Sequence, residues 1–469
     1  MPEPIHGWLT TETLSTSYGD FRFEGGYPAG DTGTRLLRQL KLNRAIEVYL
    51  TQMMPVSQIA VREGLRAFGA TSPQQIVIWE QLMDSRTVLL TANAETVYAI
   101  ALLDLKADGP TVIEAPPHML GFIQDGIQRY VMDVGMLGPD KGAGGKFLVL
   151  PPGYDGEVPD GYFAARSPTY SAMFAIRGFQ SDGSTERAIA LMEQAKVYPL
   201  ARADSQPKTV FINGSRRHID TLFPDTARFF DLLAMLVEEE PAEIFGPLER
   251  FQMQAIGIIK GTRFAPDDDT RELLNEAARI GGAMARANTY GSLDVYFYPD
   301  KQWQGITSVP YTFNFDGVPQ IDIRNNVYYM AAGNSPAMMD KNVGQGSQYL
   351  WTYRDADGDY LQGDNDYRLH IEPGIPAMNF WSVVVYDALS RSQLQTSQPL
   401  PSVSTYTEPE VNADGSIDIM FASKPPAGQF NWIQTVPGRG FFAMFRFYSP
   451  TEAFFDKTWQ LDDIRRCSS

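Results

Sequence analysis

Short apolar runs that are rich in β-branched and aromatic residues constrain the fold more than any other feature of this sequence. Four such runs lie in the first third of the chain: Ile76–Trp79, Val97–Leu105, Thr111–Glu114 and Phe147–Leu150. Gly, Pro, Asn or Asp residues bound them, which is typical of strands. Pro-Pro pairs follow the last two, and proline cannot donate a hydrogen bond to a neighbouring strand. We therefore predict four strands that end at their turn residues.

The same texture returns after residue 290. Ile417, Ile419 and Phe421 alternate with Asp418 and Met420. Further along, Phe441, Ala443, Phe445 and Phe447 alternate with Phe442, Met444, Arg446 and Tyr448. The 40 Gly and 32 Pro residues supply many turns. With 469 residues, the chain is too long for one hydrophobic core. Two β-rich domains are expected.

Helical periodicity occupies the remaining segments. Apolar residues at helical spacing predict a helix over 42–53 that Pro55 stops or kinks, and a second helix from Val56 to Phe68. Three more are predicted at the following ranges: 186–194, 225–239 with Asp225 as N-cap, and 269–288, which the Gly281-Gly282 pair interrupts or weakens.

These patterns predict an α+β fold that is mainly β, and strands do not alternate with helices as in a doubly wound sheet. The expected order is a helical lead-in (1–70), a β-sandwich domain (71–200), a helical connecting segment (201–290) and a second β-sandwich domain (291–469).

Composition excludes several classes of function. The net charge of −17, with no basic stripe, argues against nucleic-acid partners. The sequence contains no apolar stretch long enough to predict a membrane-spanning helix. The single cysteine, Cys467, excludes internal disulfides and thiolate zinc sites. Residues 1–7 lack the features of a signal peptide, so a soluble cytoplasmic protein is expected as written, or a periplasmic or secreted one if a leader was trimmed.

Known cofactor motifs are absent from the sequence. The Gly-rich run 138–146 has Asp140 where a phosphate loop needs its first Gly, and Phe147 where it needs Ser or Thr. No G-x-S-x-G motif occurs, and the four histidines lack metal-site spacing. No cofactor is predicted. Asp355, Asp357 and Asp359 are a weak candidate for calcium, and a solvated hairpin turn is the preferred interpretation.

Two groups of polar and aromatic residues are candidates for a ligand site. The first contains Asn93, Thr96, Tyr98, Arg129 and Asp133. The second is listed here: Arg324, Tyr329, Tyr349, Trp381, Tyr386, Trp432 and Arg446. Aromatic walls with Arg and Asp hold polar, carbohydrate-like or carboxylated ligands. The alternative is that the aromatic residues form the cores and that Arg–Asp pairs tie the sheets together.

Several motifs carry a family resemblance over nearly the whole length. In the first half they include Phe23-Glu24-Gly25-Gly26-Tyr27-Pro28, Leu90-Thr91-Ala92-Asn93, Gly138-Pro139-Asp140-Lys141-Gly142 and Arg166-Ser167-Pro168. In the second half they include Tyr367-Arg368-Leu369, Phe380-Trp381-Ser382-Val383 and Asn431-Trp432-Ile433-Gln434-Thr435-Val436-Pro437-Gly438. The chain resembles bacterial proteins that pair domain-of-unknown-function family 1254, N-terminal, with family 1214, C-terminal.

The resemblance implies two β-sandwich or jelly-roll-like domains bridged by helices, often in homo-oligomers such as dimers or tetramers. It implies no reaction. From the residues we expect a hydrolase or lyase for a small or oligomeric polar substrate, with Arg129 as the binding group, Asp133 as acid or base and Tyr98 as the alternative proton donor. The rival hypothesis is a non-catalytic oligomeric protein that binds a ligand or glycan.

Overall fold

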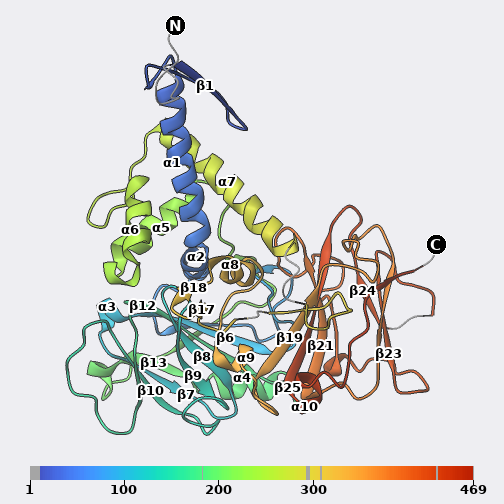
Figure 1. Cartoon of the computed structure of the whole chain (residues 1–469). Coiled ribbons are helices and arrows are strands. Elements are labelled where there is room, and N and C mark those ends of the chain that lie inside the picture. Colours follow the sequence, from blue (N-terminus) through green and yellow to red (C-terminus); the bar gives the residue numbers. More distant parts are fainter. Residues whose placement is uncertain (1–10, 182, 292–295, 307–308, 429–430, 468–469) are drawn as a thin grey trace.

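Two β-domains lie side by side beneath a set of helices (Figure 1). The computed structural model describes residues 11–181, 183–291, 296–306, 309–428 and 431–467. It contains more strand than helix, which confirms the predicted α+β, mainly β class. Within these ranges no helix combines the length and apolarity that crossing a bilayer requires.

The N-terminal domain packs a six-stranded sheet on a four-stranded sheet. The larger sheet has the order β14 (Val210–Asn213), β4 (Gln75–Ile78), β6 (Val97–Asp104), β12 (Ser171–Gly178), β8 (Leu120–Asp125) and β9 (Tyr130–Gly135). The smaller has the order β11 (Phe163–Arg166), β10 (Gly145–Leu150), β7 (Thr111–Ala115) and β13 (Lys196–Pro199). The four strands predicted between residues 76 and 150 are confirmed as β4, β6, β7 and β10.

The C-terminal domain has the same two-layer plan. Its larger sheet has the order β16 (Gln304–Gly305), β19 (Ser347–Thr352), β25 (Phe441–Pro450), β21 (Ala377–Asp387) and β22 (Ser402–Ser404). Its smaller sheet has the order β24 (Trp432–Gln434), β23 (Ile417–Ala422), β20 (Tyr367–Ile371) and β26 (Arg465–Arg466). Between the two layers lies a core rich in Phe, Tyr and Trp.

Six longer helices run above and between the domains: α1 (Thr32–Thr51), α2 (Met53–Phe68), α5 (Arg228–Glu239), α6 (Pro247–Ala255), α7 (Asp268–Gly291) and α8 (Ile321–Met330). The break between α1 and α2 falls at Gln52. Pro55 lies in the first turn of α2, where backbone N–H groups have no partner within the helix, so proline costs no hydrogen bond there. The N-cap of α5 is Ala227, so the prediction of Asp225 was wrong.

The glycine pair in α7 does not interrupt that helix. A Cβ on Gly281 would lie 2.7 Å from the ring of Tyr49, so glycine allows α1 to pack closely against α7. By contrast, α8 was missed, because its β-branched and aromatic residues suit a strand equally well in sequence.

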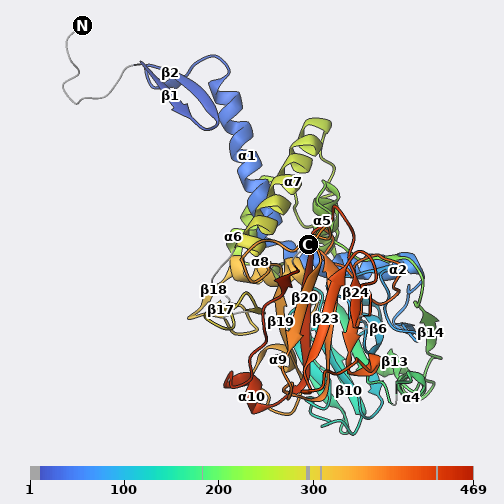
Figure 2. The same ribbon diagram turned by 90° about the vertical axis from the view of Figure 1, so that its right-hand side faces the viewer.

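The expected helical lead-in also contains strands. β1 (Thr11–Thr16), β2 (Gly19–Glu24) and β3 (Tyr27–Pro28) form a small antiparallel sheet, largely exposed. Figure 2 shows this sheet and the first turns of α1 projecting away from the body. The shorter elements are as follows: β5 (Thr87–Val88), β15 (Ile219–Asp220), β17 (Asn314–Phe315), β18 (Val318–Pro319), α3 (Leu105–Asp108), α4 (Glu186–Met192), α9 (Pro336–Met339) and α10 (Glu452–Phe455).

Candidate interdomain site

The two large sheets face each other across the domain interface, and each brings polar side chains to it. In the N-terminal sheet, Tyr98 on β6 lies opposite Arg177 on β12. In the C-terminal sheet, one cross-strand row runs over β19, β25, β21 and β22 and consists of Tyr349, Arg446, Ser382 and Ser404. Side chains opposite one another in a ladder share a face, so both rows are aligned with their polar groups on one side.

Arg446 connects the C-terminal sheet to the N-terminal domain. It is 3% exposed, and its Nη2 donates to the Thr91 carbonyl at 2.8 Å. Its guanidinium carbon lies 5.5 Å from the ring centre of Tyr386 and 6.0 Å from that of Tyr349. Such distances allow cation–π attraction.

Arg177 reaches the same place from the opposite sheet. It is also 3% exposed, and its Nη1 donates to the Tyr349 hydroxyl at 3.5 Å. Its guanidinium lies 5.9 Å from the ring centre of Tyr98. Among the described residues, neither Arg177 nor Arg446 forms an ion pair with a carboxylate. The contacts of these two buried cations are therefore mainly with tyrosine rings and hydroxyls, together with one backbone carbonyl.

The phenols stay protonated near neutral pH. Burial raises the pKa of Tyr98 and of Tyr448, although both arginines oppose this effect, and burial raises the pKa of Tyr386 to about 12. Asn93 donates to the Tyr448 hydroxyl, while its own carbonyl caps the Glu95 and Thr96 amides. Tyr98 and Tyr448 can thus donate hydrogen bonds to a bound acceptor, whereas the Tyr386 hydroxyl already donates to the Ala92 carbonyl at 2.7 Å.

The buried carboxyl group of Glu95 lies beside Ser404 and interacts electrostatically with Arg446. Its Oε2 accepts a hydrogen bond of 2.7 Å from the Ser404 hydroxyl. Burial raises its pKa, and the Ser404 and Ser402 hydroxyls and the charge of Arg446 partly offset this. The other oxygen, Oε1, is buried without a hydrogen-bond partner among the described residues.

Asp133 on β9 lies on the other side of Arg177. It is 5% exposed, and burial raises its pKa to about 6 against the lowering effects of Ser335, Arg177 and Tyr130. Its Oδ1 has no hydrogen-bond partner within the described ranges. Three strand spacings separate β6 from β9, so the backbones at Tyr98 and Asp133 lie about 14 Å apart. These two residues therefore do not act on one atom together.

Unsatisfied polar atoms concentrate at this interface. In the described parts of the chain, buried atoms without partners include Arg177 Nε, Arg446 Nη1, Glu95 Oε1, Thr96 Oγ1, Ser382 Oγ, Asp133 Oδ1 and Ser335 Oγ. Native proteins leave few buried polar groups unpaired, and a cluster of them indicates water or a ligand in place. We refer to this cluster, with Tyr98, Tyr349 and Tyr448, as the interdomain site.

Seven of the candidate residues reach this site or its edge: Asn93, Thr96, Tyr98, Asp133, Tyr349, Tyr386 and Arg446. Arg129 does not, because its Nε is held by Asp125 at 2.6 Å. Arg324 on α8 donates to the Thr51 carbonyl at 2.6 Å, and Tyr329 on the same helix stacks on Arg391.

The two predicted tryptophans have structural contacts. Trp381 belongs to the C-terminal core, where its ring stacks on Phe445. Trp432 donates its indole N–H to the Ala422 carbonyl at 2.9 Å. Trp381 thus follows the alternative interpretation, in which aromatic residues build the core, whereas Trp432 is half-buried on β24.

Hydrogen bonds within the turn stabilise the acidic segment of Asp355, Asp357 and Asp359. Asp355 accepts hydrogen bonds from the Asp357 and Asp359 amides at 3.1 and 3.0 Å. Over the residues that the structure covers, no group of three His, Cys, Asp or Glu side chains is placed to hold a metal ion. Calcium binding remains a weak prediction.

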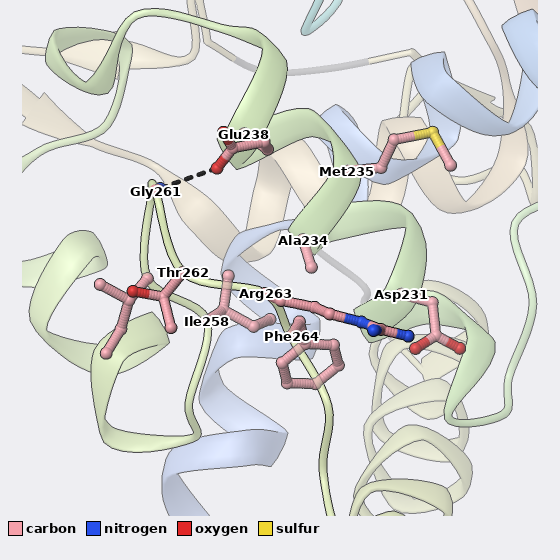
Figure 3. A pocket seen from close by; sticks show the side chains of 10 residues that line it. Asp231, Ala234, Met235, Glu238, Ile258, Gly261, Thr262, Arg263 and Phe264 are labelled. Atoms are coloured by element: carbon pink, nitrogen blue, oxygen red, sulfur yellow. Dashed lines mark hydrogen bonds between the residues drawn. The ribbon is translucent and has the colours of Figure 1, made fainter.

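Other hollows lie among the helices. One of about 490 Å³ lies between α5 and residues 258–264, where Arg263 extends toward Asp231 (Figure 3). Asp231 is already paired with Arg271, and Glu238 accepts from the Gly261 amide. The polar groups of this hollow are thus largely occupied.

A groove of about 1050 Å³ follows α7 and is bordered by Tyr329 and Arg391. Thr91 separates it from the interdomain site: the Thr91 N–H donates to the Arg391 carbonyl, and its own carbonyl accepts from Arg446, both at 2.8 Å. Thr91 therefore connects the edge of this groove to the buried Arg446 through its two backbone hydrogen bonds.

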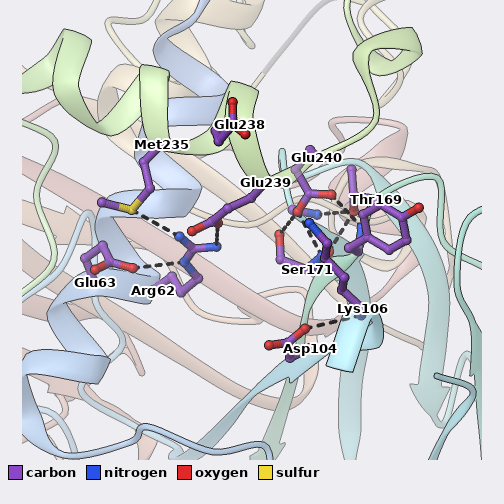
Figure 4. A network of polar contacts seen from close by, with 12 residues as sticks. Arg62, Glu63, Asp104, Lys106, Thr169, Ser171, Met235, Glu238, Glu239 and Glu240 are labelled. Atoms are coloured by element: carbon purple, nitrogen blue, oxygen red, sulfur yellow. Dashed lines mark hydrogen bonds and ion pairs between the residues drawn. The ribbon is translucent and has the colours of Figure 1, made fainter. Parts of the chain in front are cut away.

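A second polar network joins α5 to the N-terminal sheet (Figure 4). Glu240 accepts from the Ser171 amide and hydroxyl and from the Tyr170 amide, and Arg62 pairs with Glu63 and Glu239. The arginine of this network, Arg62, thus forms ion pairs with two carboxylates, as expected of a structural network.

Sequence reasoning missed Arg177, Tyr448, Glu95 and Ser382 as site residues. A signal for Arg177 exists: it is the only charge in Ser171–Gly178, a strand apolar on both faces. A charge in such a strand requires a specific reason for its burial. Tyr448 and Ser382 carry no comparable signal.

Comparisons with known proteins agree with the two-domain plan. Residues 73–199 match the sequence profile of a protein of unknown function (DUF1254), and residues 346–452 match that of another (DUF1214). The solved VPA0106 protein from Vibrio parahaemolyticus has a TM-score of 0.54 and 17% identity, over 91% of this chain and 100% of that one. This likeness concerns the fold alone.

A second solved structure, an uncharacterized protein from Burkholderia cenocepacia, has a TM-score of 0.41 and 11% identity, over 93% of this chain and 97% of that one. No curated protein matches the chain. Both profiles are matched in the expected order, so the chain combines a DUF1254 region with a DUF1214 region that follows it.

Proposed function

We propose that the chain is an enzyme of the hydrolase or lyase class that acts on a polar substrate in the interdomain site, without a nucleotide or redox cofactor. The observation that carries this proposal is the convergence between the domains of unsatisfied polar atoms with two buried arginines that, among the described residues, form no ion pair with a carboxylate. Buried groups of this kind are costly to stability and concentrate at functional sites.

The proposed roles follow from charge and protonation. Arg177 and Arg446 bind the polar group of the substrate, in place of Arg129, which Asp125 occupies. Tyr98 stays protonated and donates a hydrogen bond to that group. Asp133, with a pKa of about 6, is ionised at neutral pH and takes a proton from water or from a substrate carbon.

The test is a turnover screen of the whole chain against esters, lactones and glycans, run beside Asp133→Asn and Glu95→Gln. Activity should fall at least about a hundredfold in Asp133→Asn, while Glu95→Gln should change binding more than rate. The rate of the native protein should rise as the pH increases through about 6. A screen without turnover, or activity that Asp133→Asn retains, would contradict the proposal.

A non-catalytic, glycan-binding role is the second candidate. A groove of about 480 Å³ at the lower end of α7 is bordered by Tyr290, Tyr353 and Tyr360. Tyrosine faces suit sugar rings. Glycan binding that Tyr360→Ala abolishes, without any turnover, would favour this role. Assembly into a homo-oligomer, also expected from the resemblance, stays a prediction.

A further inference from the structure

We infer that the interdomain site binds a hydroxylated carboxylic acid, such as a sugar acid, with its carboxylate between Arg177 and Arg446. The inference names the substrate class of the enzyme proposed above and rests on that proposal for its catalytic meaning. The binding itself can be tested separately.

The two guanidinium groups converge on one place. Arg177 Nη1 donates to the Tyr349 hydroxyl at 3.5 Å, and the guanidinium carbon of Arg446 lies 6.0 Å from the centre of the same ring, although the arginines come from different domains. Two like charges buried beside one tyrosine repel each other, and the repulsion is strong where water is excluded. An anion between them offsets the repulsion.

Several other arginines pair with a carboxylate, whereas Arg391 and Arg324 form no such pair among the described residues and donate to backbone carbonyls. Arg129 pairs with Asp125, Arg439 with Asp387, and Arg62 with Glu63 and Glu239. Two carboxyl groups interact electrostatically with the interdomain arginines, Glu95 with Arg446 and Asp133 with Arg177. Among the described residues, neither forms an ion pair with these arginines, and Glu95 bonds to Ser404 instead. The site therefore lacks the directly paired carboxylate that Arg62, Arg129 and Arg439 have.

The free donors suit a carboxylate. Arg177 Nε and Arg446 Nη1 are unpaired donors among the described residues, and a carboxylate has two oxygens that accept from both. Phosphate presents four oxygens, which is more than the two unpaired guanidinium donors can satisfy. The unpaired hydroxyls of Thr96 and Ser382 adjoin the same polar rows, and they match hydroxyl groups next to the carboxylate.

The experiment is calorimetric titration of the full chain with galacturonate, and with its neutral methyl ester, galactose, propionate and phosphate. We expect galacturonate to bind at least about tenfold more tightly than its ester or galactose, because only the free acid meets both cations. Propionate should bind more weakly than galacturonate. Phosphate should not compete.

Variants locate the site. Arg177→Met and Arg446→Met should each weaken galacturonate binding by about tenfold or more, whereas Arg324→Met, which removes a buried arginine outside the site, should not. The native-protein comparison of acid with ester needs no variant, so the test holds even where a variant fails to fold. Equal binding of acid and ester, tighter binding of phosphate, or no binding would overturn the inference.

The two proposals fail in different ways. Galacturonate binding without turnover of any related ester, lactone or glycan would leave the carboxylate site standing and remove the enzyme. Turnover of neutral substrates without galacturonate binding would support the enzyme and remove the carboxylate site.

Discussion

The two faces of β25 are both buried, yet they differ in character. One face points into the C-terminal core and carries Phe441, Ala443, Phe445 and Phe447, in contact with Trp381, Phe454 and Trp459. The opposite face carries Phe442, Met444, Arg446 and Tyr448, and its last two residues meet the N-terminal domain. One strand therefore serves a dry aromatic core and a polar interface.

The difference separates residues that stabilise from residues that are costly to stability. Apolar side chains in a core gain free energy from burial and dense packing. A buried charge without an opposite charge loses solvation and is poorly repaid. Substitutions on the core face should therefore destabilise the protein, and those on the interdomain face should affect ligand binding more than folding.

The largest effect is expected on the core face. Phe445→Ala should lower the free energy of unfolding by about 3–5 kcal/mol, because it removes a fully buried ring and leaves a cavity. Denaturant unfolding measures this loss. Ligand binding below the melting temperature should remain. A loss under about 1 kcal/mol would show that the core face is not what stabilises this domain.

Next is Asp133→Asn, whose effect depends on pH. The native pKa is about 6 and the ordinary value is 3.8, so the folded protein holds this proton more tightly and native stability falls as the pH rises from 3.8 to 6. The asparagine variant avoids this loss. It should be more stable than the native protein at pH 7 by up to about 3 kcal/mol, with no such gain below pH 4. Unfolding at pH 4 and pH 8 checks this, and destabilisation at both would contradict it.

A smaller effect is expected for Arg446→Met, the neighbour of Phe445. Removing the buried charge relieves its desolvation and its repulsion from Arg177, but leaves the Thr91 carbonyl without its donor. The free energy of unfolding should stay within about 2 kcal/mol of the native value. A loss as large as that of Phe445→Ala would mean that Arg446 is primarily a structural link between the domains.

The smallest effect compares two serines in one cross-strand row. Ser382 has an unpaired hydroxyl, so Ser382→Ala should raise the free energy of unfolding by about 1 kcal/mol. Ser404 donates to Glu95, so Ser404→Ala should lower it by a similar amount. Equal effects of both substitutions would show that position in the row, not hydrogen bonding, decides the outcome.

Local patterns predicted much of the fold. Alternation identified both faces of β25, because strand side chains alternate in direction with a period of two residues. Periodicity likewise placed α2, α5 and α7 within about three residues, but it began α1 ten residues too late, at Leu42 instead of Thr32. The exception was α8, where strand-type residues form a helix buried against other helices, so tertiary packing overrode propensity.

The sequence by itself thus determined the mainly β class, the two-domain order and the alternation of side chains along β25. Only the tertiary structure decided which faces meet. Asn93 and Tyr448, and likewise Thr91 and Arg446, lie 355 residues apart and touch because two sheets from different domains pack together. Strand patterns report burial of a face but not the identity of its partner, since that choice depends on the packing of whole sheets.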